Sequence, residues 1–346
     1  MRVSRRAKAL LDFLSAGGRK LSPLLILTHD HPDPDALASA WGLAHLARSL
    51  GGIKARIAYG GTIGRAENRM MAERLGIPAE VLRPREIASF EHAALVDTQP
   101  AFRNNRFPPR RKPDIIVDHH PLNAATRADF AWIDKTAGAT TTLVAEALLA
   151  SGVRVPPRLS TAIVYGIGSE TQNLGREATG RDLAVYQAFW PKANVKTLWN
   201  IAYPRRSSDF FATITRAIRR AFVARNVIGT NLGPLKSPDR VAQVADFLLT
   251  HEKMRWSIVT GRYRGKLHVS LRTTDPEGSA GTLLRRLLGG RNRAGGHQMV
   301  AGGAIEVGAD VSEEKWSEVE DAVTLAFLES RGIKHPEDRS RPYENA

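Results

Sequence analysis

The chain has 346 residues, of which 42% are hydrophobic and 25% are charged, and this composition excludes a disordered or fibrous protein. It contains no cysteine, which excludes disulfides and thiolate ligands, so any metal must be held by histidines and carboxylates. The formal net charge of +15 attracts polyanions such as nucleotides, although a generally basic proteome would produce the same excess. No apolar run is long enough to span a membrane, and the basic first residues lack the apolar stretch of a signal peptide, so we expect a cytoplasmic protein without membrane contact.

The first two hundred residues alternate between short apolar runs and helical patterns, as βαβ units do. We expect strands at 24–28, 53–59, 93–96 and 115–117, and helices at 36–50, 66–75, 139–150 and 160–166. Three of these strands lead directly into polar residues. Because ligands bind at the carboxyl edge of an open parallel sheet, these polar residues are candidates for one shared site.

The pattern changes in the second part of the chain. Residues 203–240 are irregular and basic and predict a linker with one or two helices. Strands at 256–260, 266–271 and 301–307 then alternate with helices at 241–250, 281–288 and 313–329. The sequence therefore predicts an α/β protein in which a mostly parallel sheet flanked by helices is joined to a smaller α+β domain. The expected boundaries are 1–202, 203–240, 241–330 and a flexible tail at 331–346.

The loop after the first expected strand crowds five ionisable side chains into seven residues, namely His29, Asp30, His31, Asp33 and Asp35. Such crowding costs free energy unless a cation neutralises the carboxylates. Hard divalent ions such as Mn²⁺ or Mg²⁺ take carboxylate oxygens together with one or two imidazoles. Pro32 and Pro34 restrict the backbone around Asp33 and would hold neighbouring ligands in fixed directions. The alternative is a solvated acidic turn in which Asp35 caps the following helix.

Two further strand ends carry acidic or imidazole side chains. Asp118, His119 and His120 follow the apolar run 115–117, where one ring can face a metal and the other a substrate. Asp97 follows the run 94–96. A surface loop would explain the first group, and a turn or cap would explain Asp97. Their common place at the ends of parallel strands favours a shared site.

A glycine-rich loop in the second part of the chain can hold an anion. The backbone N–H groups of Gly295 and Gly296 can approach a phosphate closely because these residues have no side chain. His297 and Arg272 would add charged donors, Arg272 in bidentate fashion. The alternative is a tight turn before the strand at 301–307.

In combination, these motifs resemble the DHH phosphoesterase superfamily. The H-x-x-P-D-x-D-A loop from His29, the strand-end Asp97 and the triplet at 118–120 stand in the order and approximate spacing of that family. The Gly-Gly-His segment at 295–297 looks like the signature of the DHH-associated C-terminal domain, and the segment at 270–272 is similar to its Ser-x-Arg segment. The resemblance covers residues 24–307. The compact length resembles the bacterial nanoRNase and 3′-phosphoadenosine-5′-phosphate phosphatase branch.

The resemblance implies two divalent ions, with Mn²⁺ expected first and Mg²⁺ or Co²⁺ as alternatives. The implied metal ligands are His29, Asp33, Asp35, Asp97, His119 and Glu170. Of these, His29 and Asp33 would hold one ion, Asp35 and His119 the other, and Asp97 both. Glu170 stands where the family normally has an aspartate, which either shifts the loop or weakens the second metal site.

The family also implies roles for residues beside the metals. His120 would contact the scissile phosphate and Asp118 would orient the histidines, so these two are the expected catalytic residues. The expected substrate-binding residues are Arg272, Gly295, Gly296 and His297. Metals would then lie in the first domain and substrate contacts in the second.

The expected function is hydrolysis of short oligonucleotides, dinucleotides or 3′-phosphoadenosine 5′-phosphate by a metal-dependent phosphodiesterase or phosphatase. Long nucleic acid is less favoured as a partner, because the chain has few aromatic residues. The alternatives are a RecJ-like single-strand exonuclease, although such enzymes are longer, and a nucleotide-binding module with a decayed metal site. A pyrophosphatase is disfavoured by the Gly-Gly-His segment, and a homodimer stays open.

Overall fold

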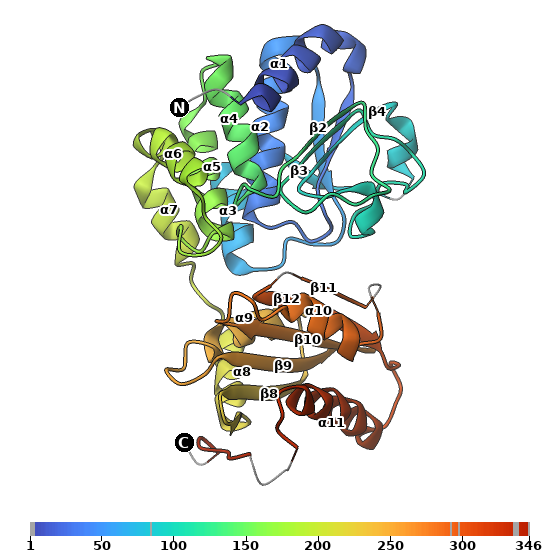
Figure 1. Ribbon diagram of the computed structural model, residues 1–346, viewed down its shortest axis with the longest axis vertical. Coiled ribbons are helices and arrows are strands. Elements are labelled where there is room, and N and C mark those ends of the chain that lie inside the picture. The colour runs from blue at the N-terminus through green and yellow to red at the C-terminus, as the bar shows by residue number, and fades with distance from the viewer. Residues whose placement is uncertain (1–3, 84, 291–292, 297, 335–338, 345–346) are drawn as a thin grey trace. The chain divides into compact units, whose positions relative to one another are not determined.

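A computed structural model describes residues 4–83, 85–290, 293–296, 298–334 and 339–344. The chain divides into two compact units, Met1–Pro204 and Arg205–Ala346, each described below by itself (Figure 1). The expected α/β class is confirmed: a parallel sheet flanked by helices is followed by an α+β unit.

The first unit contains six strands and seven α-helices within its described residues. The strands are β1 (Leu24–Leu27), β2 (Ala55–Tyr59), β3 (Ala79–Val81), β4 (His92–Val96), β5 (Ile115–Asp118) and β6 (Phe130–Ile133). The helices are α1 (Arg5–Gly17), α2 (Pro34–Gly51), α3 (Ala66–Leu75), α4 (Thr140–Ser151), α5 (Pro157–Glu170), α6 (Gly180–Phe189) and α7 (Val195–Ala202). Short 3-10 turns are η1 (Gly18–Leu21), η2 (Glu86–Ser89), η3 (Pro100–Phe102) and η4 (Trp190–Lys192). The sequence interpretation did not include α1, α6, α7, β3 or β6.

The strand order β3-β2-β1-β4-β5-β6 places the expected functional loops side by side. All neighbouring strands are parallel, and Leu27 of β1 lies opposite Ala58 of β2 and Leu95 of β4. The order reverses between β1 and β4, and the crevice outside such a switch point is where open α/β sheets bind ligands. The loops after β1, β4 and β5 therefore meet at one edge.

Hydrophobic cores cover both faces of this sheet, which explains its continuous apolar strands. Leu24 and Ile26 point into a core that includes helices α1, α2, α4 and α5. Leu25 and Leu27 point into a second core with Leu82, Ile87 and other residues. Because both faces of the sheet are covered, a ligand can reach it only at the polar loops that follow the strand ends.

The second unit is a mixed sheet with helices on its two faces. Its strands are β7 (Phe222–Ala224), β8 (Val227–Pro234), β9 (Trp256–Tyr263), β10 (Lys266–Thr273), β11 (Ala294–Gly296) and β12 (Val300–Glu306), in the order β11-β12-β10-β9-β8-β7. Its helices are α8 (Ser208–Arg219), α9 (Asp239–Leu248), α10 (Ala280–Leu287) and α11 (Glu313–Ser330). Only the β8–β9 pair is parallel among these described strands. Helices α8 and α9 share one core with the sheet, and α10 and α11 share the other.

Two expectations for this region differ from the structure. The segment 203–240, expected as a linker, contains helix α8 but also strands β7 and β8 of the second sheet. These strands were missed because the surrounding basic residues hide the apolar run that begins at Val227. The tail was expected to be frayed, yet Ser340 forms a bridge with Val223 of β7 through two backbone hydrogen bonds of 2.8 and 2.9 Å.

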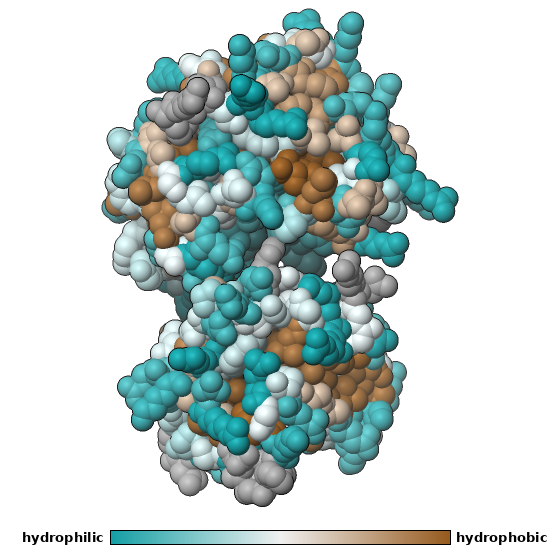
Figure 2. Space-filling view, in the orientation of Figure 1, coloured by the Kyte–Doolittle hydropathy of each residue, from teal (hydrophilic) through white to brown (hydrophobic). Residues whose placement is uncertain are grey.

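Hydrophilic residues cover most of the face of each unit seen in Figure 2. Among the described residues, none of the helices combines the length and apolar character that a membrane crossing requires.

Candidate metal centre

The loop between β1 and α2 brings three of its five ionisable side chains to the sheet edge. Asp33 is the N-cap of α2, where its Oδ1 accepts a hydrogen bond from the Ala36 backbone N–H at 3.0 Å. Asp35 follows in the first turn and is buried. The Nδ1–H of His29 donates to the Asp30 carbonyl at 2.9 Å, which leaves Nε2 directed at Asp33 and Asp97. The cap is thus Asp33 rather than Asp35.

The other two ionisable side chains of this loop have partners outside the cluster. Asp30 lies 3.5 Å from the guanidinium of Arg106, and His31 contacts the backbone of Thr62. The loop therefore separates into a group that faces the other strand ends and a group that holds the neighbouring loops in place.

Asp97 is the centre of the cluster. It follows β4 with a φ of 60°, a left-handed conformation that is strained for a residue with a side chain and is retained mainly at functional sites. Its Oδ2 lies 3.6 Å from His29 Nε2, and its Oδ1 lies 3.6 Å from His119 Nε2. The two oxygens of one buried carboxylate therefore face two different imidazoles.

The residues at the end of β5 form the other side of the cluster. His119 Nε2 lies 4.0 Å from Asp35 Oδ2, while its Nδ1 lies 3.4 Å from the Ala137 carbonyl. His120 donates from Nδ1 to Asp118 Oδ1 at 2.8 Å, and the same nitrogen is 3.5 Å from Asp97. Asp118 is fully buried, and its hydrogen bond to Nδ1 fixes the orientation of the His120 ring.

Two compact groups of candidate metal ligands result, and they share one residue. The first is His29, Asp33 and Asp97; the second is Asp97, His119 and His120. In each group, one ligand atom per residue lies within 4.8 Å of the others. The arrangement has the form of two adjacent cation sites with Asp97 between them.

The electrostatics of the cluster fit cations. Burial and the neighbouring carboxylates, first Asp97 and then Asp33, raise the pKa of Asp35 well above its ordinary value. Burial opposes protonation of His29, yet its hydrogen bonds with Asp33 and Asp97 raise its pKa well above the ordinary value. Protons thus compensate the crowded negative charge. Divalent ions would do so more completely with this oxygen and imidazole donor set.

Glu170 ends α5 beside this cluster without joining either compact group. Burial, followed by the charge of Asp33, raises the pKa of its carboxyl, so this carboxyl interacts electrostatically with the cluster. Arg176 donates to the Glu170 carbonyl at 2.9 Å and lies 3.7 Å from its carboxylate. This arginine competes for the carboxylate that the sequence assigned to a metal.

Residues that the sequence interpretation did not select hold the carboxylates in place. Asp35 accepts hydrogen bonds from the backbone N–H groups of Thr140 and Thr141 at 2.8 and 2.7 Å. The hydroxyl of Thr140 also donates to Asp97 at 2.8 Å. Gln99 donates to Asp118 at 2.7 Å. The sequence signal was the threonine run that opens α4, because the first N–H groups of a helix attract anions.

The sequence and structure together identify the family. Residues 23–167 match the DHH family, N-terminal domain, and residues 224–327 match the DHHA1 domain. The chain belongs to the DHH superfamily. The ligand cluster lies in its DHH domain, and Arg272 and the glycine loop lie in its DHHA1 domain.

Three known proteins are similar to this chain over different parts of their lengths. An uncharacterized protein of Methanocaldococcus jannaschii is 33% identical over 327 residues, which cover 92% of this chain but 66% of that protein. The A-adding tRNA nucleotidyltransferase of Aquifex aeolicus is 27% identical over 69% of this chain and 28% of its own length. An exopolyphosphatase-related protein from Bacteroides fragilis shares the fold, with a TM-score of 0.71 and 16% identity, covering 93% and 97% of the two chains. This chain spans less than two thirds of both sequence relatives.

In the DHHA1 domain, Arg272 is buried and already has partners. Its guanidinium forms an ion pair with Asp246 and donates to Ser270 Oγ at 2.7 Å and to the Ala301 carbonyl at 3.1 Å. These contacts tie α9, β10 and β12 together. Substrate binding by Arg272 stays a prediction. It would require the guanidinium to give up contacts with Asp246, Ser270 or Ala301 and to bind the substrate instead.

The glycine loop is placed in part. Gly295 and Gly296 are exposed on β11, opposite Gly302 and Ala301 of β12. A Cβ at Gly295 would meet no atom within 4 Å, so its backbone is open to a ligand. Gly296 has a φ of 141° and its missing Cβ would lie 2.2 Å from the Val300 carbonyl, so glycine is required there. His297 lies outside the described residues.

Proposed function

We propose that this chain is a metal-dependent phosphoesterase that hydrolyses short oligonucleotides, dinucleotides or 3′-phosphoadenosine 5′-phosphate. The observation that carries this proposal is the pair of compact ligand groups that share Asp97 at the switch point of a parallel sheet. Membership of the DHH superfamily supports the same chemistry.

Each side chain of the cluster would have a defined role. One ion would be held by His29, Asp33 and Asp97. A second would be held by Asp97 and His119 of the other compact group together with Asp35, which lies 4.0 Å from His119, and Glu170. His120, the third member of that group, would face the substrate instead. Two divalent ions, Mn²⁺ in the first place, would supply a water of lowered pKa and positive charge for the phosphoryl oxygens when bound.

The residues at the end of β5 would act on the phosphate itself. In the metal-free chain the pKa of His120 is raised to about 9; burial opposes this shift, and the hydrogen bond to Asp118 and the charge of Asp97 produce it, so this imidazole would carry a proton. A protonated imidazole donates to a phosphoryl oxygen as charge develops there. Asp118 holds that imidazole in one orientation and Gln99 holds Asp118.

The test is a substrate panel. Purified full-length chain is assayed with Mn²⁺, Mg²⁺ and Co²⁺ on a linear dinucleotide, 3′-phosphoadenosine 5′-phosphate, a cyclic dinucleotide, inorganic polyphosphate and a single strand of roughly thirty nucleotides. We expect the small nucleotides to turn over fastest. Faster release of nucleotides from the long strand would overturn the substrate size and favour a RecJ-like exonuclease, and preference for polyphosphate would overturn the nucleotide assignment. Asp97→Asn serves as the control for contaminating hydrolases.

A second candidate is a nucleotide-binding module without turnover. The contact between Arg176 and Glu170 favours it, because a carboxylate engaged by an arginine binds a cation less well. Substitution of Glu170→Asp restores the residue type of the family. If the natural chain binds dinucleotide without hydrolysing it and Glu170→Asp hydrolyses it, the module is the correct function.

The cytoplasmic location and the homodimer stay predictions. Fractionation of the native cell and light scattering of the purified chain test them.

A further inference from the structure

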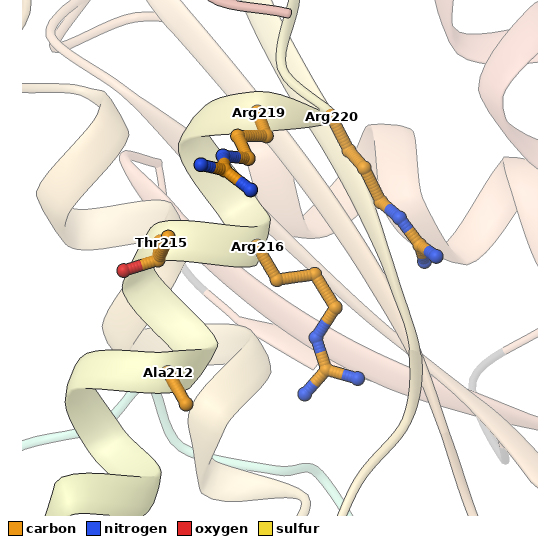
Figure 3. A pocket seen from close by; sticks show the side chains of 5 residues that line it. All are labelled: Ala212, Thr215, Arg216, Arg219 and Arg220. Carbon is orange, nitrogen blue, oxygen red and sulfur yellow. The ribbon is translucent and has the colours of Figure 1, made fainter. Parts of the chain in front are cut away.

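Helix α8 of the second unit carries a basic surface that the phosphoesterase site does not use. Ala212, Arg216 and Arg220 succeed one another at intervals of four residues, as do Phe211, Thr215 and Arg219. Residues four apart lie on the same helical face, so these form two adjacent rows. In Figure 3, the side chains of Arg216 and Arg220 extend to one side of the helix and that of Thr215 points to the other.

Ala212, Thr215, Arg216, Arg219 and Arg220 line a shallow, open hollow of about 390 Å³ on this helix. Within the described residues, the guanidiniums of Arg216, Arg219 and Arg220 have no ion pair or side-chain hydrogen bond. Three neighbouring positive charges without a carboxylate repel one another, and an anion with several charges would relieve this repulsion.

Other arginines of the same unit show that this arrangement is not general. Arg262 pairs with Glu313 and Glu320, and Arg240 pairs with Asp209. Within the described part of the chain, carboxylates thus pair with Arg262 and Arg240 but with none of the three arginines at the end of α8. Across residues 205–240, eight basic side chains stand against two acidic ones, so the basic character extends along this whole segment.

An exposed aromatic ring lies on the same helix as the arginines. Phe211 precedes Arg216, Arg219 and Arg220 by about one and a half to two and a half turns. Phe211 is 62% exposed, although a phenylalanine side chain is usually buried. The guanidiniums of Arg206 and Arg240 lie 5.0 and 5.1 Å from the ring centre of its neighbour Phe210, and the two phenylalanine rings meet edge to face at 6.0 Å. The backbone below Phe211 is therefore fixed while its ring faces solvent.

Guanidiniums that contact phosphates, combined with an exposed ring on which a base can stack, are the features by which proteins hold single-stranded nucleic acid. We propose that the α8 surface, formed by Phe211, Arg216, Arg219 and Arg220, binds single-stranded nucleic acid. The arginines contact successive phosphates and Phe211 stacks on a base. The surface acts without the metal centre, so it stands whether or not the phosphoesterase proposal holds.

The test measures binding of a fluorescent single-stranded RNA of about twelve nucleotides to the full-length chain in EDTA, where hydrolysis is suppressed. The variant is Arg216→Glu with Arg219→Glu and Arg220→Glu. The matched control is Arg5→Glu with Arg6→Glu and Lys8→Glu, three exposed basic residues of α1, which changes the net charge equally. We expect the α8 variant to lose at least tenfold in affinity and the control to lose less than threefold.

Salt dependence and the aromatic ring make the test specific. Each phosphate contact to a single strand contributes about 0.7 to the slope of log affinity against log salt, so loss of three contacts lowers the slope by about 2. Phe211→Ala should weaken RNA binding by about fivefold or more without changing that slope.

Three outcomes would overturn the proposal. The first is equal loss in the α8 variant and the α1 control, which indicates net charge alone. The second is unchanged binding in the α8 variant. The third is an arginine effect without a Phe211 effect, which assigns the surface to a polyanion without bases. If the glutamate variant melts below the natural chain, the triple Arg→Gln variant of the same three positions replaces it.

Discussion

Substitution of Thr140→Val tests whether the threonines of α4 position the metal ligands. The Thr140 hydroxyl donates to Asp97 at 2.8 Å and accepts from the His119 backbone N–H at 3.2 Å. Valine has nearly the same shape, so the buried site keeps its volume and loses only these two hydrogen bonds. We expect weaker metal binding, because Asp97 and His119 lose the contact that orients them.

The expected size of the effect follows from these contacts. Loss of a hydrogen bond that orients a metal ligand lowers metal affinity or activity by about 10- to 100-fold. Because one bond involves a charged carboxylate, the free energy of unfolding should also fall by about 1.5–3 kcal/mol. Metal affinity is read from the Mn²⁺ dependence of dinucleotide hydrolysis and from calorimetric titration. Stability is read from urea unfolding in EDTA.

Thr142→Val provides the matched control two residues later in the same helix. The buried Thr142 hydroxyl donates to Asp182 at 2.5 Å, in a network that includes Thr179 and the Gly138 backbone but no metal ligand. We expect a similar loss of stability with unchanged Mn²⁺ affinity. Equal Mn²⁺ affinities for the two variants would refute the reasoning, since the loss would then come from general loosening of α4.

Three further outcomes are expected. Asp97→Ala should abolish turnover, because both ligand groups share this carboxylate, and wild-type rates in that variant would contradict the metal assignment. In the metal-free chain, the contribution of protonated His120 to the free energy of unfolding should be complete below pH 6.5 and be lost as the pH rises through about 9, because its pKa is raised in the folded state. The free energies of unfolding of wild type and His120→Gln, measured in urea across this range, should therefore converge at the alkaline end. Arg272→Ala should raise KM more than it lowers kcat and should also lower the melting temperature, because Asp246 and the Ala301 carbonyl lose a buried donor; a loss confined to kcat would contradict a role in substrate binding.

Local sequence indicated where the candidate centre lies because several of its residues follow strands, while the metal and substrate roles of these residues stay predictions. The apolar runs before His29, Asp97 and Asp118 predict parallel strands, and the carboxyl ends of parallel strands meet at one edge. The glycines after α2 and α3 ended these helices as expected, with Gly52 and Gly76 in the left-handed conformation. The sequence alone therefore determined the features that depend on neighbours along the chain, namely where strands end in polar residues and where glycines end helices.

Contacts between distant residues were decided only by the tertiary structure. Nothing local to Thr140 indicates that it reaches Asp97, and nothing local to Arg272 indicates that Asp246 neutralises it in a buried position. The strands β7 and β8 likewise became recognisable only through pairing with their neighbours. The physical reason is that hydrogen bonds and ion pairs depend on three-dimensional proximity, whereas helix and strand patterns depend on spacing along the chain.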